Sequence, residues 1–290
     1  MFGFKSLQNT PMQPSKKAFP DVTLLITHYN RSLSLNRLLK SFFERKIFFG
    51  NIVVSDDGSS PEHLVALYNL KTVFNFELVC TPINKGLGNN INKGQDAVNT
   101  PFTLYVQEDF VPKHDFIQVF SEGLNIMQTD AQIDIIRFYS YFPYPYIKPY
   151  KNNFEEMIFH SSPRYANHLK FYLYSDHPHL RRSNFLQKFG RYPEGIKGDA
   201  TEFGMAISVL KNKGRALLYK PFSSVFDQLN SADEPSTMVR NHWRQKKTPA
   251  VIILRTIYLP YRLLKNTWQY FMHKKNSCLH HYTPKISPFL

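Results

Sequence analysis

Residues 51–70, "NIVVSDDGSSPEHLVALYNL", contain a complete strand, turn and helix unit. The apolar residues at 52–54 predict a short buried strand, and two aspartates and a glycine follow it directly. Ser60 followed by Pro61 is typical of a helix N-terminus, because proline lacks an N–H and already has a helical φ. This stretch therefore predicts a β-strand that leads into an α-helix, with carboxylates at the carboxyl end of the strand.

The same order of strand and helix is repeated on both sides of this unit. Residues 22–29 predict another buried strand, and leucines and phenylalanines between 35 and 43 follow it at helical spacing. Further strands are predicted at 76–82 and 102–109, each with a helix after it. This alternation predicts an α/β fold, in which a mostly parallel central sheet is flanked by helices on both faces.

Each predicted strand ends in polar side chains. These are Thr27, Tyr29 and Asn30 after the first strand, Asp56 and Asp57 after the second, Asn84 and Lys85 after the third, and Gln107, Glu108 and Asp109 after the fourth. Ligands of open α/β sheets bind outside the carboxyl ends of the strands. The four strand ends therefore predict one binding site along a single edge of the sheet.

Some acidic residues also have a purely structural interpretation. Asp56 and Asp57 precede Gly58, and Asp-Asp-Gly-Ser is favourable turn chemistry in itself. Asp199 and Glu202 have the spacing of a capping box, with Asp as N-cap and Glu at the third helical position. For these residues, structural and functional roles both stay open at this point.

Positive charge is concentrated at the end of the chain. The formal net charge is +14, and +10 of it follows the last acidic residue, Glu234. The basic residues there are Arg240, Arg244, Lys246, Lys247, Arg255, Arg262, Lys265, Lys274, Lys275 and Lys285. Aromatic and aliphatic residues are mixed with them, and such a basic amphipathic segment fits an anionic membrane surface. The alternative is a pair of helices, divided or kinked at Pro260, that pack on the preceding domain.

Simple features of the chain argue against other classes of protein. The two cysteines, Cys80 and Cys278, suit a reducing compartment and not a disulfide-built fold. Residues 1–20 lack the apolar core of a secretory signal, so we expect a short polar leader there. No stretch approaches the roughly 18 to 20 apolar residues of a membrane span. We therefore expect a cytoplasmic protein.

The order of these motifs resembles the family 2 glycosyltransferases, which have the GT-A fold. The matching stretches are "LLITHYNR" at 24–31, "IVVSDDGSS" at 52–60, "NKGLGNNINKG" at 84–94, "LYVQEDF" at 104–110 and "DATEF" at 199–203. The combination of "VSDDGSS" with "NKGLG" is the most specific part. The resemblance implies inverting transfer of a sugar from a nucleotide-diphosphate sugar to a hydroxyl acceptor, such as a cell-envelope glycan or a lipid-linked oligosaccharide.

The resemblance also implies residues that bind the nucleotide. Thr27 and Tyr29 would border the base, with Asn30 beside them. Asp56 or Asp57 would hydrogen-bond the base or the ribose. The floor under the nucleotide would be shaped by Asn84, Gly86 and Asn92, and Gln107 and Glu108 would lie at its diphosphate end.

The family's metal-binding and catalytic acids have counterparts here. A short acidic motif, often Asp-X-Asp, binds a divalent cation in the family, so Asp109 and Glu108 are the implied ligands for Mn²⁺ or Mg²⁺. Gln107 departs from this motif at its first acidic position. A later acid at a helix start serves as general base, and Glu202 stands closest to it, with Asp199 as the other candidate. In place of the family's late histidine ligand, "SSVFDQLN" offers Asp227.

The acceptor side is less regular in sequence. Residues 140–195 are rich in Tyr, Phe, His, Pro and Arg and show little periodicity. Within them, "YSDHPHLRRSNF" at 174–185 is a candidate acceptor-binding or lid segment. His177, Arg181 and Arg182 are its candidate contacts, although solvated charge is an equal interpretation for the two arginines.

These observations suggest a division of the chain. Residues 1–20 form the leader, 21–235 the GT-A domain, and 236–290 a basic amphipathic C-terminal helical extension. Within the domain, 21–112 is the nucleotide-binding half and 113–235 the acceptor half. The extension would hold the protein at the inner face of the plasma membrane.

Two other functions stay open. A catalytically inactive nucleotide- or sugar-binding protein on the same fold is the first alternative, because Gln107 departs from the acidic motif and function depends on the site and not on the fold. A nucleic-acid-binding protein is suggested by the pI of about 9.6. Such a protein usually spreads its basic residues over the binding surface. Here they are terminal and the predicted site is acidic, so we expect no nucleic acid.

Overall fold

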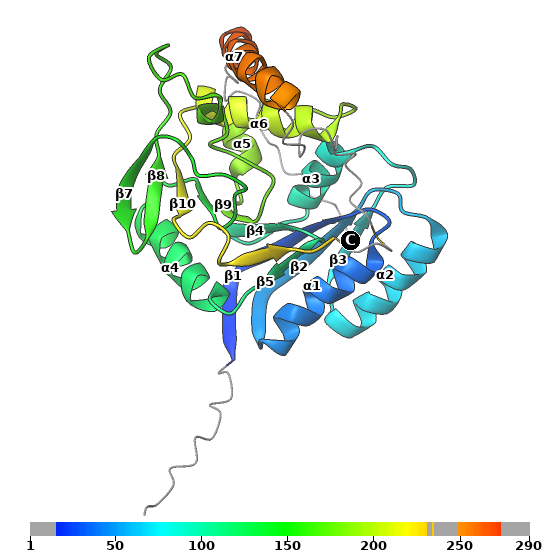
Figure 1. Cartoon of the computed structure of the whole chain (residues 1–290). Helices are drawn as coiled ribbons and strands as arrows, with labels where there is room; N and C mark the ends of the chain where they lie inside the picture. Colours follow the sequence, from blue (N-terminus) through cyan, green and yellow to red (C-terminus); the bar gives the residue numbers. More distant parts are fainter. Residues whose placement is uncertain (1–15, 231–233, 235–248, 274–290) are drawn as a thin grey trace, which may run out of the picture.

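The computed structural model describes residues 16–230, 234 and 249–273. Its first half contains long strands and the helices that connect them (Figure 1). These elements are β1 (Lys17–His28), α1 (Ser32–Glu44), β2 (Ile47–Asp56), α2 (Pro61–Phe74), β3 (Glu77–Cys80), α3 (Leu87–Asp96), β4 (Phe102–Gln107), β5 (Phe110–Pro112) and α4 (Phe116–Thr129).

The second half is built of shorter elements. They are β6 (Ile135–Arg137), β7 (Ile147–Lys151), β8 (Phe154–Met157), η1 (His168–Phe171), β9 (His179–Arg182), α5 (Phe185–Phe189), α6 (Gly198–Lys211), β10 (Ala216–Tyr219), β11 (Phe226–Gln228) and α7 (Pro249–Met272). Most of the predicted leader, and residues 236–248 and 274–290 of the predicted extension, lie outside the described residues.

A nine-stranded sheet runs through the molecule in the order β3-β2-β1-β4-β9-β6-β10-β8-β7. Strands β3, β2, β1 and β4 are parallel to one another, as the sequence predicts. Strand β9 is antiparallel to both of its neighbours, β4 and β6, and joins this parallel half to the rest of the sheet. The predicted α/β class, with helices around a large central sheet, is confirmed.

Alternating side chains place one hydrophobic core on each face of the sheet. Leu24 and Ile26 of β1 belong to the core beneath α1, α2 and α4. Leu25, between them, belongs to the core beneath α3, α5 and α6. Since successive side chains of a strand point to opposite faces, one apolar strand contributes to both cores. The continuous apolar run at 22–26 is therefore a consequence of burial on both sides.

The first strand begins earlier than the sequence predicts. Lys17, Ala18 and Phe19 pair with residues 47–49 of β2, and Phe19 is buried. The pairing shifts in register before Thr23, so this part of β1 lacks the even apolar pattern that marks residues 22–28. The predicted leader is consequently shorter than residues 1–20.

Two glycines allow α3 to approach its neighbours closely. A Cβ atom at Gly88 would lie 2.2 Å from the carbonyl oxygen of Pro193. A Cβ atom at Gly94 would lie 2.7 Å from Leu25 and 2.9 Å from Ser55. The glycines of "NKGLGNNINKG" thus serve close packing of α3 between the sheet and the loop before α6.

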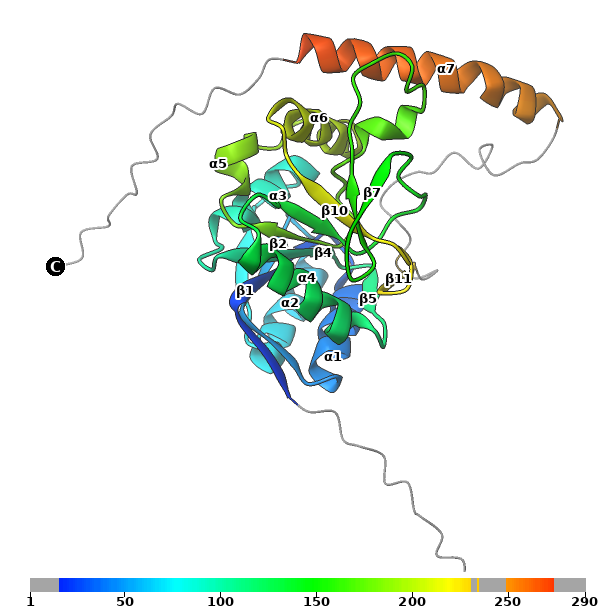
Figure 2. The same cartoon turned by 90° about the vertical axis from the view of Figure 1, so that its left-hand side faces the viewer.

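In the described part of the C-terminal extension, residues 249–273, one long helix is present where the sequence suggested two. Pro260 lies inside α7 and does not divide it. The helix lies on the outer side of α6 in both views (Figures 1 and 2). Within the part of the chain that the structure describes, no helix is both long enough and apolar enough to cross a membrane.

Candidate active site

The carboxyl ends of the parallel strands meet at one edge of the sheet. Thr27 of β1 pairs with Ser55 of β2 on one side and with Gln107 of β4 on the other. Asp56 in turn pairs with Cys80 at the end of β3. The polar strand ends that the sequence singles out are therefore neighbours in space.

Asp56 organises the turn after β2 from a fully buried position. Its Oδ1 lies 2.8 Å from Nδ1 of His28, and its Oδ2 accepts a hydrogen bond from the backbone N–H of Ser59. Burial raises the pKa of Asp56, but the hydrogen bonds from His28 and Ser59 outweigh it and hold the pKa below the usual value. The backbone N–H of Arg31 donates to Nε2 of His28, so Nδ1 carries the proton and faces Asp56.

Asp57 connects β2 to the loop before α3. Its two oxygens accept hydrogen bonds from the backbone N–H groups of Lys85 and Gly86, at 2.9 and 2.8 Å. Gly86 has a φ of 86°, which favours glycine, and its N–H also lies 3.0 Å from Oδ1 of Asn84. Asp57, Asn84 and Gly86 are thus brought together, and Asn84 is exposed at the edge of the site.

Lys93 of α3 is a further charged group at this edge. Its Nζ donates to the backbone carbonyl of Asp56 and lies 3.5 Å from the hydroxyl of Thr81. Burial lowers the pKa of Lys93, and the neighbouring Asp57 and Asp56 carboxylates oppose this effect. The lysine brings positive charge under the turn that follows β2.

Arg31 is paired with the acidic residues after β4. Its Nη1 lies 3.2 Å from Oε1 of Glu108 and 3.7 Å from Oδ2 of Asp109, and all three side chains are buried. Its Nη2 donates to Oδ1 of Asn230 and to the backbone carbonyl of Glu234. Burial, followed by the adjacent Asp109, raises the pKa of Glu108 to about 8. Arg31 ends the stretch "LLITHYNR", but its pairing with Glu108, 77 residues later, is not visible in the sequence.

Asp109 has one oxygen available for a ligand. Its Oδ2 accepts a hydrogen bond of 2.8 Å from the side-chain amide of Gln228. Its Oδ1 is buried and has no hydrogen-bond partner within the described structure. A buried carboxylate oxygen without a partner is costly, and it is the kind of ligand that Mg²⁺ and Mn²⁺ prefer. The residues present therefore fit a divalent cation at this position.

The protein itself would supply few ligands to such a cation. Across residues 16–230, 234 and 249–273, no three His, Cys, Asp or Glu side chains form a cluster that could hold a metal ion. Asp227 directly precedes Gln228 in the sequence. Its Oδ1 accepts a hydrogen bond of 3.1 Å from Nζ of Lys113, whereas the side-chain amide of Gln228 donates to Asp109. Asp227 is thus not the late metal ligand that the sequence suggested, because alternate side chains of β11 lie on opposite sides.

Glu202 lies in the first turns of α6 and has partners outside the helix. One of its oxygens, Oε1, accepts hydrogen bonds from the hydroxyl of Ser175 at 2.6 Å and from the backbone N–H of Asp176 at 3.0 Å. The helix begins at Gly198 with Lys197 as N-cap, and no side chain caps it. The capping-box interpretation is therefore wrong, and Asp199 is an exposed residue of the first turn.

Asp176 is a second buried acid beside Glu202. Its Oδ1 accepts a hydrogen bond of 2.5 Å from Tyr174, whose hydroxyl also lies 2.5 Å from that of Tyr192. Its Oδ2 is buried without a hydrogen-bond partner among the described groups. Burial, followed by the charge of Glu202, raises the pKa of Asp176 to about 8. The motif "YSDHPHL" contains this acid, but its burial is not visible in sequence.

One chain of contacts connects the acidic pair after β4 with Glu202. Gln228, which donates to Asp109, also accepts a hydrogen bond from the hydroxyl of Tyr141. The ring of Tyr141 lies 4.5 Å from that of His177, and His177 Nδ1 lies 3.0 Å from the hydroxyl of Ser175. Ser175 in turn donates to Glu202. The predicted residue His177 therefore lies between the two acidic centres.

Several other predicted site residues serve the core. Arg181 is fully buried, and its guanidinium donates to Gln95 and Tyr192. Arg182 donates to three backbone carbonyls, those of Met127, Asp130 and Ile133. Because these donors are already used internally, the predicted acceptor contacts of Arg181 and Arg182 do not fit the structure.

Thr27 and Asn92 are also internal. The hydroxyl of Thr27 lies 3.0 Å from that of Tyr105 beneath the sheet edge. Asn92 is buried, exchanges hydrogen bonds with the backbone of Tyr192 and donates to Glu194. Besides the exposed Asn84, the predicted residues Tyr29, Asn30 and Gln107 have surface at the edge and are half-buried.

The sheet topology and this acidic edge define the class of GT-A nucleotide-diphospho-sugar transferases. The family model described as glycosyl transferase family 2 matches residues 23–190, which is more than half of the chain. The chain belongs to this family, and the family predicted from its motifs is confirmed. Comparison with curated proteins gave no match.

Solved structures of similar fold include two kinds of glycosyltransferase. S. aureus TarS 1-349 in complex with UDP-GlcNAc has a TM-score of 0.57 and 13% identity, over 86% of this chain and 73% of that one. In another structure of TarS 1-349, with a TM-score of 0.52 and 16% identity, the similarity covers 71% of this chain and only 59% of that one. The mannosyltransferase PcManGT from Pyrobaculum calidifontis, in complex with GDP-Man and Mn²⁺, has a TM-score of 0.50 and 14% identity, over 90% and 77%. These likenesses confirm the GT-A fold.

Proposed function

We propose that the chain transfers a sugar from a nucleotide-diphosphate sugar to a hydroxyl acceptor, with inversion at the anomeric carbon. The observation that carries this proposal is the buried carboxylate of Asp109, whose Oδ1 has no partner in the described part of the chain. In a family 2 chain, a ligand oxygen at the carboxyl end of β4 suits the diphosphate end of a donor. The complexes of TarS with UDP-GlcNAc and of PcManGT with GDP-Man support a donor of this class.

The nucleotide lies, in this proposal, along the ends of β1 to β4. Tyr29 and Asn30 contact it after β1, and Gln107 contacts it after β4. Asp57 acts mainly through the backbone, because both of its oxygens hold the loop that carries Asn84 and Gly86. Thr27, Asp56 and Asn92 shape this floor from below without contacting the ligand, since all three are buried and hydrogen-bonded.

Asp109, with Glu108 beside it, would hold a divalent cation next to the diphosphate. When bound, Mn²⁺ or Mg²⁺ supplies positive charge that favours departure of the nucleoside diphosphate. Gln228 orients Asp109 through its Oδ2 and leaves Oδ1 toward the ligand. Arg31 supplies a permanent positive charge on the other side of the pair.

Glu202 is the proposed general base. The acceptor oxygen forms a bond to the anomeric carbon while the bond from that carbon to the diphosphate oxygen breaks, and Glu202 takes the acceptor's proton. Ser175 and the backbone of Asp176 fix the Glu202 carboxylate by donating to it. Asp199 is exposed one helical turn earlier and is the weaker candidate. His177, between the two acidic centres, borders the acceptor.

The setting that we propose is synthesis of a cell-envelope glycan or a lipid-linked oligosaccharide at the inner face of the plasma membrane. The basic residues after Glu234 support an anionic membrane surface as a partner. They are separated along the chain from the acidic site, which argues against a nucleic-acid-binding function.

The test is release of nucleoside diphosphate from UDP-, GDP- and dTDP-sugars, with and without Mn²⁺. Wild type is compared with Asp109→Ala and Glu202→Gln. Asp227→Asn and Asp199→Asn are matched controls, because each removes an exposed acid close in sequence to the site. We expect release from one donor, dependence on metal, and a loss of at least about a hundredfold in the first two variants only.

The competing function is a nucleotide binder without transferase activity. It is favoured by Gln107 at the first position of the acidic motif and by Arg31 against the carboxylates. Binding of UDP or GDP without release from any donor, in the presence of a panel of glycan and lipid-linked acceptors, would favour this function. Activity that is unchanged in Asp109→Ala would contradict the metal-binding role.

A further inference from the structure

One face of α7 is fixed against the domain. The ring of Tyr270 lies 5.0 Å from that of Phe159. Nζ of Lys211 lies 4.4 Å from the centre of the Tyr270 ring. The guanidinium of Arg262 donates a 2.6 Å hydrogen bond to the hydroxyl of Tyr172. Asn266, between these positions, is buried. These contacts set the rotation of the helix about its own axis.

The opposite face of α7 exposes large apolar side chains to solvent. Their exposed fractions are 59% for Tyr261, 70% for Leu264, 66% for Trp268, 63% for Phe271 and 62% for Met272. We call these five residues the outer stripe. Their spacing of three, four, three and one residues places them on one side of a helix. A contiguous apolar stripe on a surface helix marks an interaction site, because it would otherwise stay in water.

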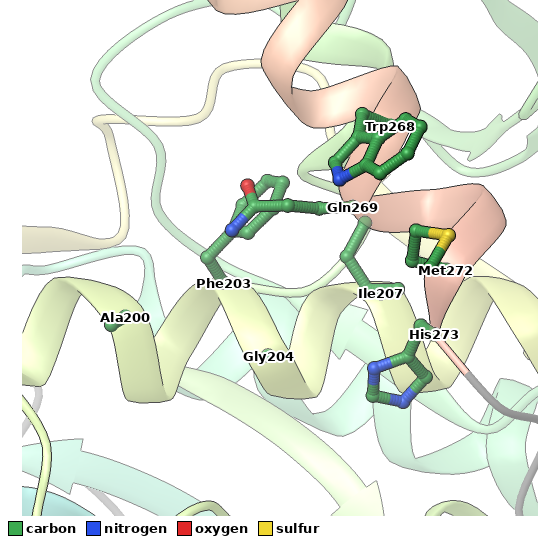
Figure 3. Close-up of a pocket in the computed structure, with 8 residues that line it drawn as sticks. All are labelled: Ala200, Phe203, Gly204, Ile207, Trp268, Gln269, Met272 and His273. Atoms are coloured by element: carbon green, nitrogen blue, oxygen red, sulfur yellow. The ribbon is translucent and has the colours of Figure 1, made fainter.

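The outer stripe continues into a groove between α6 and α7. Ala200, Phe203, Gly204 and Ile207 form its α6 wall, and Trp268 and Met272 belong both to the α7 wall and to the stripe (Figure 3). The groove has a volume of about 320 Å³ and opens to the surface. Its lining is mainly apolar, and its size suits a segment of hydrocarbon chain.

The charge around the stripe indicates which partner covers it. Lys265 lies next to Leu264 in the helix and is exposed. Ten basic residues and no acidic ones follow Glu234 in the sequence. A second copy of the chain carries the same net positive charge, and repulsion between the copies opposes a dimer. An anionic lipid surface offers both negative charge and hydrocarbon.

We propose that α7 lies in the interface of an anionic lipid bilayer, with the outer stripe among the acyl chains and a lipid chain in the groove beside α6. This inference deepens the membrane setting of the proposed function and does not depend on the proposed reaction. Helix α6 lies between α7 and the sheet in both views (Figures 1 and 2). The docked orientation therefore brings the helix that carries Glu202 to the membrane side of the protein.

Fluorescence of Trp268 tests the docking directly. Trp243 and Trp268 are the two tryptophans of the chain, so Trp243→Phe makes Trp268 the only reporter. We expect a blue shift with vesicles of phosphatidylcholine and phosphatidylglycerol, quenching by brominated acyl chains, and little change with phosphatidylcholine alone. An unchanged spectrum with the anionic vesicles would overturn the proposal.

Vesicle flotation with matched variants tests whether the outer stripe is the surface that binds lipid. The triple variant Leu264→Ser, Trp268→Ser and Phe271→Ser removes the stripe. Its control is Val65→Ser, Tyr68→Ser and Val73→Ser on α2, which removes three apolar side chains of similar exposure. We expect partitioning into anionic vesicles to fall by more than about tenfold in the stripe variant alone, because this variant has less apolar surface to transfer from water into the bilayer.

Other outcomes of the same experiment count against lipid docking. Equal flotation of the two triple variants would show that the stripe does not bind lipid. A dimer in sedimentation without lipid, lost in the stripe variant, would assign the face to a second copy. Donor turnover without acceptor and without lipid is measured in both variants. If it persists while flotation is lost, the docking surface and the proposed reaction are separated.

Discussion

Arg31 supplies the positive charge beside two adjacent buried acids, Glu108 and Asp109. Its guanidinium contacts both Glu108 and Asp109, and its other nitrogen holds Asn230 and the backbone of Glu234. Buried ion pairs contribute little net stability, but removal of one partner leaves the other charge buried and unpaired. Arg31 therefore controls both the order of the site and its charge.

Substitution of Arg31 should affect stability and activity together. For Arg31→Gln we expect the free energy of unfolding to fall by about 3 kcal/mol, as for a broken buried pair. We expect kcat/KM to fall more than about tenfold, because the carboxylates lose their orientation. Urea unfolding and donor turnover measure these effects. Arg37→Gln, which loses one hydrogen bond to Leu229 at the surface, is the control, and equal losses in both variants would contradict this role.

Asp176 should make the stability of the protein depend on pH. Burial and the charge of Glu202 raise its pKa from 3.8 to about 8. Between these values the folded protein keeps a proton that the unfolded chain has released. The contribution of this group to stability is therefore full below about pH 4 and is lost as the pH rises through about 8.

Asp176→Asn removes this titration. We expect the free energy of unfolding of the variant to fall less steeply between about pH 4 and pH 8 than that of wild type, measured by urea unfolding. The pKa of Glu108 is also raised, so part of the pH dependence of stability remains in both proteins. Asp199→Asn, which removes an exposed acid, should leave the slope unchanged. The same slope in Asp176→Asn and wild type would refute the assignment.

The sequence shows which residue types lie at the sheet edge but not which of them are paired. Asp56, Asp57 and Asp109 are visible because each follows an apolar strand. Their partners are set by tertiary contacts: Arg31 reaches Glu108 across 77 residues, and Gln228 reaches Asp109 across 119. No local pattern encodes such pairs, so the structure was needed to find them.

At the level of elements, periodicity identified the first half of the sheet well. Strands buried on both faces have continuous apolar runs, and the helices between them have one apolar stripe. Strands β7 to β9 are four or five residues long and come from the aromatic segment at 140–195, which has no clear period. Short strands that depend on distant partners carry little local signal, which explains why this half was not predicted in detail.

The packing of α3 gives a test at this level. Gly88→Ala places a Cβ atom 2.2 Å from the carbonyl oxygen of Pro193, so the backbone has to move. We expect a loss of about 1–3 kcal/mol in the free energy of unfolding, as for other overpacked sites. At Gly198, the first residue of α6, the nearest atom to an added Cβ lies 3.6 Å away. Gly198→Ala should therefore be neutral, and equal effects of the two substitutions would contradict this account.

At the scale of the whole molecule, Tyr270 is one of the side chains that attach the long helix α7 to the domain. Tyr270 packs on Phe159 and Phe171, whereas the next residue, Phe271, is 63% exposed. In the absence of lipid, we expect Tyr270→Ala to increase hydrogen exchange along α7, because its main ring contacts are lost. Phe271→Ala should leave exchange unchanged. Equal exchange in both variants would place the attachment elsewhere.

The charge of the whole chain has a different meaning from the charge of its site. A net charge of +14 suggests an anionic partner, but ten of these charges follow Glu234. The edge of the sheet instead gathers carboxylates with Arg31 and Lys93 among them. Composition therefore indicates the surface that the molecule approaches, and local arrangement indicates the chemistry at its site.

The position of β9 also has a consequence for the order of folding on the ribosome. This strand pairs with β4 on one side and β6 on the other, although it follows both in the sequence. Until residue 182 has left the exit tunnel, the two halves of the sheet have no bridge, and the edges of β4 and β6 are open to other chains. At roughly 5–20 residues per second, the nascent protein spends several seconds in this state. Synthesis of β9 closes the edge of β4 and one edge of β6, and β10, made later, pairs with the other edge of β6 and with β8.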